Sequence, residues 1–498
     1  MNVASRWKML NLTWVSFFLT FVVWFNLAPF TSSIAKAMNL TKEQVHTLII
    51  CNVALTIPAR IFVGRLVDRY GPRRVFSAIL VIFAVPCLLF AMATEYWQLV
   101  VLRLAISGIG AGFVVGIRLV GEWFDAREIG LAEGIYGGLG NFGMAVASFA
   151  LPLLAAAFGG VNGWRWAMAI SAVLCVIWAF VYLRHAQDAP PGKHFKASAS
   201  KGALEVSSRG DLIALSLMQI PLLACMGIIA WRLVGVHLIA PWVGNVFYVI
   251  LPLLFVRSVF KIRKANAHLL RSRLRRESDS TGVGVEQGEH HYSFAQVAIL
   301  CLCYAVTFGG ELAVESMLPA YFEKMFGVSV ATAGVLGAGF AFASLIARPL
   351  GGYLGDKYGR RPVIIISLAG SAAGFFAIHQ INNAWPLWAV MTVTMLAGLF
   401  LMAANGANFC IAPLIRKPLT GQIAGLIGAY GNVGSVLFLA LLSITTPSVF
   451  FLTMGIVGVA AFAACFMLRE PARIPHHEEA RPVEAAPVGA QVGNVAMA

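Results

Sequence analysis

The sequence has little charge for its length. Of its 498 residues, 12% are Asp, Glu, Lys or Arg and 59% are hydrophobic, and the mean hydropathy is +0.79. Soluble domains carry about 25% charged residues, so a soluble globular protein is excluded. The sequence also lacks a nucleotide-binding glycine loop with a lysine, a metal-ligand cluster and a nucleophile–base motif. We therefore expect neither an enzyme nor an ATP-driven pump, and neither a cofactor nor a metal.

The chain instead contains a series of apolar runs, each long enough to cross the roughly 30 Å hydrocarbon core of a bilayer. They lie near residues 12–30, 45–64, 75–93, 99–119, 131–157 and 164–183, and again near 294–320, 330–350, 362–381, 386–411, 423–443 and 449–468. This pattern predicts an all-α integral membrane protein with an N-terminal six-helix half at 1–183 and a C-terminal six-helix half at 294–468.

Residues 184–293 between the halves form a polar, basic linker with two further apolar runs, near 211–231 and 236–257. Two extra transmembrane helices would keep both termini on one side, which favours a fourteen-helix protein. The prolines of this segment leave a re-entrant or interfacial hairpin as a second interpretation. The tail at 469–498 is rich in Pro, Ala and Glu, and we expect it to be disordered in the cytoplasm.

The formal net charge of +15 arises from 37 basic and 22 acidic residues. Most loop Lys and Arg residues fall on one side of the predicted topology, and the opposite loops hold only Lys36, Lys42 and Lys324. The positive-inside rule then places both termini in the cytoplasm. The basic charge therefore reflects a multi-pass topology in the lipid bilayer of the inner membrane. We expect a monomer with no nucleic-acid partner.

Two blocks of sequence each occur twice, in the same order in both halves. The copies of the first block are Ala59–Arg73 and Ala347–Arg361, and those of the glycine-rich second block are Gly130–Gly143 and Gly421–Gly434. Each copy places a charged or amide side chain in an apolar stretch, where polar groups are costly. Many secondary transporters form a central binding site from such a two-fold repeat. The repeat therefore indicates a carrier for a small anion.

The motifs resemble those of a known family. Gly64–Arg74, with its second copy at Gly352–Arg361, is similar to the loop motif of the major facilitator superfamily. Gly137–Gly143 and Gly428–Gly434 resemble the two signatures of the nitrate/nitrite porter family, and Asn405–Phe409 fits the tenth helix of that family. The resemblance covers both halves but not residues 184–293. It implies the major facilitator fold and a transporter of nitrate, with nitrite as a further substrate.

Arg60 and Arg348 occupy matched positions in the first block. A guanidinium presents a planar fork of N–H donors that suits two coplanar oxygens of nitrate. From the residues alone, each arginine could instead extend to the interface, one turn before its loop. The resemblance implies the first role, because the paired substrate arginines of the family fall on these two positions.

Asn141 and Asn432 follow Gly140 and Gly431 in the second block. Their amides could donate to nitrate while the glycines leave space beside the ion, or the same residues could serve close helix packing. The resemblance favours substrate contact. It also implies that four aromatic side chains line the site, although each could be ordinary packing: Tyr304, Phe308, Phe113 and Phe409.

Carboxylates suggest how transport is coupled and gated. Glu311 and Glu315 lie four residues apart in one span. They are candidates for a proton relay, or they could lie near the outer opening of the carrier and remain ionised and hydrated. Glu311 also matches a glutamate that the resemblance associates with proton-coupled members. Asp68 and Asp356, with the arginines beside them, are predicted to form salt bridges between helices that hold one face of the carrier closed, and the gating residues include Arg73 and Arg361.

These observations predict an importer of nitrate that works by proton symport and alternating access. Nitrate/nitrite exchange remains an alternative within the family. A carrier of small organic anions could also use two arginines, although the Gly/Asn blocks disfavour it. A membrane sensor would have only the inserted hairpin and its basic loop in its favour.

Overall fold

The structure is a computed structural model that describes residues 3–159, 162–193, 195, 197, 203–278, 292–328 and 330–470. The N-terminal half contains α1 (Val3–Phe25), η1 (Ala28–Phe30), α2 (Thr31–Ala37), α3 (Lys42–Ala54), α4 (Thr56–Tyr70), α5 (Pro72–Met92), α6 (Tyr96–Ser107), η2 (Gly108–Ala111), α7 (Gly112–Trp123), α8 (Ile129–Phe158) and α9 (Gly163–His185). The inserted segment contains α10 (Arg209–Leu217), α11 (Gln219–Gly235) and α12 (Pro241–Ser278). The C-terminal half contains α13 (Phe294–Phe326), α14 (Val330–Tyr358), α15 (Arg360–His379), α16 (Leu387–Phe409), α17 (Ala412–Ile415), η3 (Lys417–Leu419), α18 (Thr420–Ile444) and α19 (Pro447–Cys465).

The predicted all-α membrane architecture is confirmed. Thirteen helical segments of the described chain are long and apolar enough to cross a membrane, and they include both runs of the inserted segment, Arg209–Gly235 and Pro241–Ala267. In addition, the 29-residue helix α14 packs lengthwise against α8 and α16. The predicted disordered tail lies outside the described residues, apart from Arg469 and Glu470.

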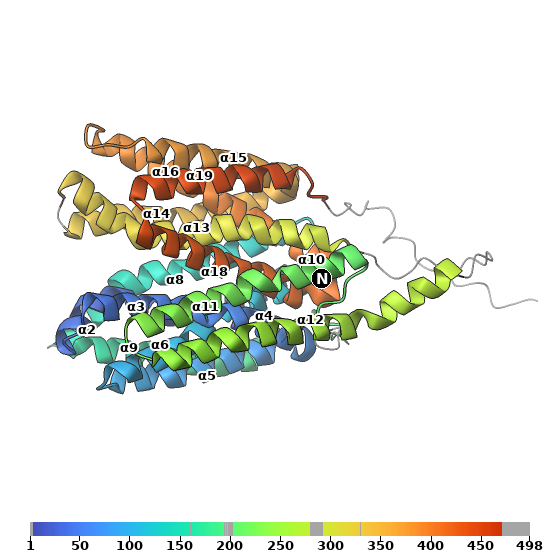
Figure 1. Cartoon of the computed structure of the whole chain (residues 1–498), viewed down its shortest axis with the longest axis horizontal. Helices are drawn as coiled ribbons and strands as arrows, with labels where there is room; N and C mark the ends of the chain where they lie inside the picture. The colour runs from blue at the N-terminus through green and yellow to red at the C-terminus, as the bar shows by residue number, and fades with distance from the viewer. Residues whose placement is uncertain are drawn as a thin grey trace, which may run out of the picture.

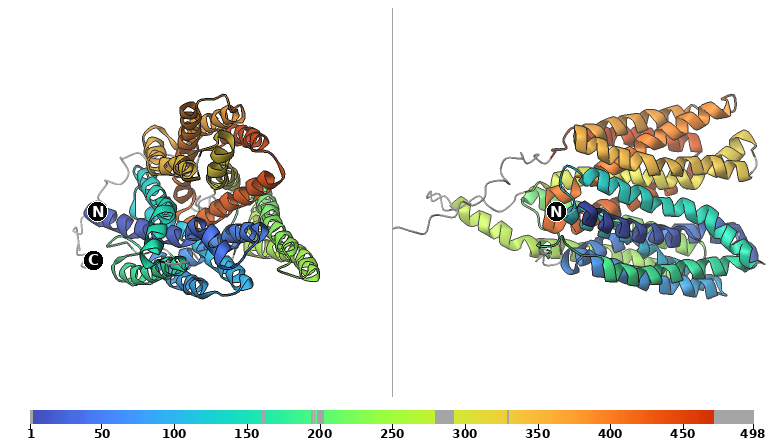
Figure 2. Two further views of the ribbon diagram at one scale, coloured as in Figure 1. Left: turned by 90° about the vertical axis from the view of Figure 1, so that its left-hand side faces the viewer. Right: turned by 180° about the vertical axis from the view of Figure 1, so that it is seen from behind.

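The helices run roughly along one axis in two groups, one from each half of the chain (Figure 1). Viewed along that axis, the two groups face each other and the inserted helices stand at one side of the bundle (Figure 2). The most extensive packing between the halves joins α8 to α14 and α4 to α18. These four helices carry the repeated blocks, so the duplicated sequence lies where the two halves meet.

The inserted helices contact both halves. α11 packs against α12 within the insertion, against α3 of the N-terminal half and against α18 of the C-terminal half. α10 packs against α13. Toward its C-terminus, α12 extends beyond the end of the bundle on the side where the chain begins (Figure 1).

Glycines of the loop motif set the geometry at that end. Gly71 and Gly359 adopt φ values of 85° and 104°, a conformation that a residue with a Cβ rarely adopts, and so permit the tight turns that follow α4 and α14. Two helical turns earlier, Gly64 lies against the carbonyl of Gly421, and Gly352 against that of Gly130, so closely that any side chain would clash. The two halves therefore meet backbone to backbone at this end.

Candidate functional site

Arg60 lies fully buried on α4, at the centre of the interface between the halves. Its Nε donates to the carbonyl oxygen of Gly110 at 3.2 Å, and its Nη1 to that of Gly428, on α18 of the other half, at 2.7 Å. Its Nη2 is buried and has no hydrogen-bond partner. Within the described part of the chain, no carboxylate lies within ion-pair distance of this guanidinium. Among the described residues, the positive charge of Arg60 therefore has no carboxylate partner, and the Tyr304 side chain is a polar neighbour of its guanidinium.

Arg348, the matched residue on α14, is equally buried but has a carboxylate partner. Its Nη2 lies 2.6 Å from Oε2 of Glu311 on α13. Asn405 of α16 also donates to that oxygen, at 2.6 Å. Asn141 of α8 adds a contact from the other half, with Nδ2 3.4 Å from Glu311 Oε1. Turning the Asn141 amide over would instead place its oxygen 2.6 Å from Arg348 Nη2. In either orientation Asn141 joins the buried pair.

Aromatic rings lie between and beside the two arginines. The ring centre of Phe308 is 5.1 Å from Cζ of Arg60 and 5.8 Å from Cζ of Arg348, within the range of cation–π attraction. Tyr304 stacks on Phe308 with ring centres 4.9 Å apart. Phe409 meets Tyr304 and Phe113 edge-on at 4.5 and 4.6 Å. The four predicted aromatics are therefore in one buried cluster built from both halves.

Asn432 is in a different setting from Asn141, its counterpart. Its Nδ2 donates to the carbonyl of Gly428 at 3.1 Å, the same oxygen that Arg60 binds, and its Oδ1 is buried without a partner. Gly431 lies against the aromatic cluster, since an added Cβ would come within 2.6 Å of Tyr304. An added Cβ at Gly140 would clash with Phe17 of α1. At each of these two glycines, the space that a side chain would need is occupied by a neighbouring aromatic ring.

Glu315 lies one helical turn beyond Glu311 on α13 and is partly buried. Its Oε2 is inaccessible and has no hydrogen-bond partner. Among the described residues, four buried polar atoms of this network thus lack a protein partner: Arg60 Nη2, Asn405 Oδ1, Asn432 Oδ1 and Glu315 Oε2. Because buried polar groups are normally hydrogen-bonded in native proteins, a ligand with acceptor oxygens would satisfy Arg60 Nη2, whereas the unpartnered oxygens require a donor or a proton.

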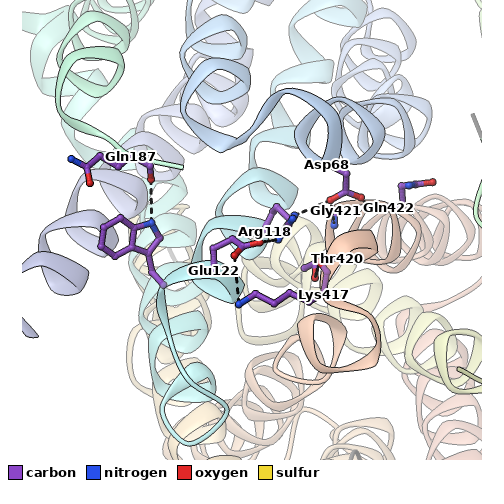
Figure 3. A network of polar contacts seen from close by, with 9 residues as sticks. Asp68, Arg118, Glu122, Gln187, Lys417, Thr420, Gly421 and Gln422 are labelled. Carbon is purple, nitrogen blue, oxygen red and sulfur yellow. Dashed lines mark hydrogen bonds and ion pairs between the residues drawn. The ribbon is translucent and has the colours of Figure 1, made fainter. Parts of the chain in front are cut away.

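The two aspartates of the loop motifs form latches between the halves. Asp68 of α4 accepts hydrogen bonds from the backbone N–H groups of Gly421 and Gln422, both at 2.8 Å (Figure 3). Asp356 of α14 accepts from Gly130 and Leu131, at 3.0 and 2.8 Å. Each carboxylate thereby caps the N-terminus of a helix in the opposite half, where free N–H groups and the helix dipole favour a negative charge.

The arginines that pair with these aspartates differ from the predicted ones. Arg118 of α7 lies 3.0 Å from Asp68 (Figure 3), and Arg360 lies 2.9 Å from Asp356. Arg73 instead donates to the carbonyl of Leu183 at 2.6 Å, and Arg361 to that of Phe466 at 2.7 Å. Both arginines come directly after a tight turn, and their side chains point toward the C-terminal ends of α9 and α19 in their own halves. They therefore do not point toward the aspartates.

Sequence reasoning therefore missed Arg118 and the role of Asn405. Arg118 had a visible signal, an arginine in an apolar span followed four residues later by Glu122, to which it binds. Glu122 also lies 3.5 Å from Lys417, which extends this network to the C-terminal half (Figure 3). Asn405 had been noted only as part of a family motif.

The chain is similar to known membrane transporters over most of its length. The family model for the Major Facilitator Superfamily matches residues 13–269 and 300–495. The nitrate/nitrite transporter NrtP of Nostoc punctiforme is 42% identical over 479 residues, covering 94% of each chain. A nitrate/nitrite transporter NrtP of a Picosynechococcus species is 38% identical over 509 residues, covering 94% of this chain and 93% of that protein.

Solved structures support the fold. A crystal structure of a double Trp mutant of XylE superposes with a TM-score of 0.67 at 14% sequence identity, covering 94% of this chain and 97% of that chain. The proton:xylose symporter XylE with a bound bromodeoxyglucose superposes with a TM-score of 0.62 at 15% identity, covering 94% and 97%. At such identities the likeness concerns the fold alone.

Proposed function

The chain belongs to the major facilitator superfamily and, within it, to the nitrate/nitrite transporters; on that basis we propose that it imports nitrate into the cytoplasm by proton symport. The nitrate/nitrite transporter from Nostoc matches nearly the whole chain, which supports nitrate as the substrate. The coupling to protons is argued from the buried charges of the site.

The observation that carries the proposal is the uncompensated guanidinium of Arg60. A buried positive charge without a counter-ion is strongly unfavourable, and the Arg60 guanidinium lies over the Phe308 ring of the aromatic cluster, with Cζ 5.1 Å from the ring centre. Nitrate would neutralise the charge and accept from the guanidinium fork. Arg348 would hold the anion from the other side, Asn141 and Asn432 would orient it, and the four aromatics would exclude water.

The charges of the site provide a reason for proton coupling. Glu311 neutralises Arg348 through their ion pair, whereas no carboxylate of the described residues lies at ion-pair distance from Arg60. Nitrate would therefore neutralise Arg60 but compete with Glu311 for Arg348. A proton taken up by Glu311 would remove that competition and release Arg348 to bind nitrate. Glu315, one turn along α13, is the second candidate to take up a proton.

The latches suggest how the site is exposed to one side at a time. We place the latch end in the cytoplasm, with both chain termini, so that closed latches block inward release. The halves would separate there when Asp68 and Asp356 leave the helix N-termini of α18 and α8. Such rocking of two repeats around a central site is typical of alternating access. The carrier would act as a monomer in the lipid bilayer of the inner membrane.

Reconstituted vesicles test the mode of coupling. Nitrate uptake is measured with an inward proton gradient, with internal nitrite, and with a protonophore that dissipates the gradient. We expect the gradient to accelerate uptake and the protonophore to cancel that acceleration. Uptake that requires internal nitrite and ignores the gradient would replace symport by nitrate/nitrite exchange.

A further inference from the structure

We propose that a pocket between the inserted helices and the two halves binds the phosphate headgroup of an anionic phospholipid. The pocket is separate from the candidate nitrate site and lies beside the latch formed by Asp68. It has a volume of about 120 Å³. Its lining comes from three parts of the chain, α4 of the N-terminal half, α18 of the C-terminal half, and the insertion.

The polar lining suits an oxyanion. Arg65 of α4 and Lys261 of α12 supply two cations, and within the described residues neither has a carboxylate at ion-pair distance. Gln219, Ser258 and Gln422 line the same pocket and offer uncharged hydrogen-bonding groups. Charge-assisted hydrogen bonds from Arg and Lys are the usual means by which proteins hold phosphate.

The surroundings of the pocket favour a lipid as the source of that phosphate. The remaining lining is apolar and includes Leu204, Leu215 and Ile262. On the pocket-facing side of α12, one and two turns before Ser258, the side chains of Leu254 and Ile250 are 40% and 39% exposed. An acyl chain could follow this face while its headgroup enters the pocket. A soluble oxyanion would make no use of the apolar surface.

Positive charge continues along α12. Arg257, Arg263 and Lys264 are also exposed on this helix, near the end of the bundle that we place in the cytoplasm. The cytoplasmic leaflet is negatively charged and attracts basic segments at the membrane surface. The shared pocket distinguishes Arg65 and Lys261 from these neighbours, because only these two cations line it.

A bound headgroup would connect α4, α12 and α18. Arg65 precedes the latch residue Asp68 by three positions, and Gln422 both lines the pocket and donates its backbone N–H to Asp68. Since α4 and α18 belong to opposite halves, occupancy would favour the state in which the latch is closed. The inserted helices would thus complete a lipid site that stabilises one conformation of the carrier.

The test uses the full-length protein, purified in detergent and depleted of lipid. The midpoint of thermal unfolding is measured after addition of phosphatidylglycerol, phosphatidylcholine or inorganic phosphate. We expect phosphatidylglycerol alone to raise the midpoint, by several degrees, and native mass spectrometry to detect phosphatidylglycerol retained on the protein. An equal rise with inorganic phosphate would overturn the assignment to a lipid.

Variants separate the pocket from general charge attraction. The double variant R65Q/K261Q should lose the response, whereas the matched control R263Q/K264Q, which removes the same charge from α12 outside the pocket, should keep it. Ser258→Leu, which fills the pocket and keeps both cations, should also lose it, and Lys261→Arg should retain it. Equal responses of R65Q/K261Q and R263Q/K264Q, or an undiminished response of Ser258→Leu, would overturn the proposal.

Discussion

Arg60 and Arg348 occupy matched positions of a repeated block, yet their electrostatic surroundings differ. Arg348 has a carboxylate, Glu311, at 2.6 Å and an amide, Asn141, beside it. Among the described residues, Arg60 has the backbone carbonyls of Gly110 and Gly428, the Tyr304 side chain and the faces of aromatic rings as neighbours, but no carboxylate at ion-pair distance. The repeat therefore supplies two equivalent cations, and among the described residues a carboxylate neutralises Arg348 but not Arg60.

This asymmetry assigns different tasks to the two halves. The N-terminal half would provide the permanent attraction for the anion. The C-terminal half would provide a cation whose availability depends on the protonation of its partner. The same contrast recurs at the latches, because Asp68 pairs with a buried arginine of α7 whereas Asp356 pairs with Arg360, four residues along the chain.

The largest expected effect comes from replacing the uncompensated arginine. Arg60→Lys removes the planar fork while keeping the charge, and we expect nitrate uptake into proteoliposomes to fall by at least about 30-fold, as the loss of a buried charged hydrogen bond of about 2–5 kcal/mol implies. Arg348→Lys should cost about tenfold, since Glu311 already engages part of that guanidinium.

Arg165→Lys is the matched control for both variants. Arg165 binds the carbonyls of Ala91 and Ala93 at the other end of its half, so this change should leave uptake unchanged. Full uptake by Arg60→Lys would contradict the clamp, and equal losses in both substrate arginines would contradict the asymmetry.

The second effect concerns coupling. Glu311→Gln keeps the shape of the side chain but cannot exchange a proton, so nitrate uptake should no longer respond to an inward proton gradient. Nitrate binding should persist, because Arg348 is released from its ion pair. Uptake with and without the gradient is measured together with nitrate affinity, and Glu323→Gln, an exposed acid near the end of the same helix, serves as the control. A retained gradient response would move the coupling to Glu315.

The third effect compares the latches. Asp68→Asn should lower the thermal unfolding midpoint more than Asp356→Asn, because it takes a carboxylate away from Arg118 in a fully buried setting, where breaking a charge pair costs about 3–5 kcal/mol. Both variants should also increase the population of the state in which the two halves are separated at the latch end. Labelling of a cysteine introduced there would measure this opening, and a larger effect from Asp356→Asn would reverse the order that we infer.

The smallest effect uses two matched glycines beside the arginines. An added Cβ at Gly428 would lie 3.0 Å from Cδ of Arg60, whereas at Gly137 it would lie 3.6 Å from Nη1 of Arg348, an ordinary contact. We therefore expect Gly428→Ala to raise the KM for nitrate a few-fold and Gly137→Ala to change it little. Similar KM values for the two variants would show that the Arg60 side chain adjusts freely.

Much of the site was predictable because its residues belong to short sequence motifs. Two arginines in apolar runs, each with a glycine-rich block in the same half, are visible without coordinates. The salt bridges of Arg73 and Arg361 were not predicted correctly, because their neighbours in sequence do not determine where a side chain points after a tight turn. Arg118 was missed because its partner Asp68 lies on another helix, 50 residues away.

The sequence by itself determined the membrane architecture, the two-fold repeat and the presence of two arginines at matched depths. Those features depend on periodicity and composition along the chain. Only the tertiary structure decided that Glu311 pairs with Arg348 while no carboxylate of the described residues pairs with Arg60, and that each latch aspartate caps a helix of the opposite half. Such contacts join residues that are tens to hundreds of positions apart in the sequence. Because charges interact strongly in the low-dielectric space between packed helices, these contacts determine the charge balance of the site.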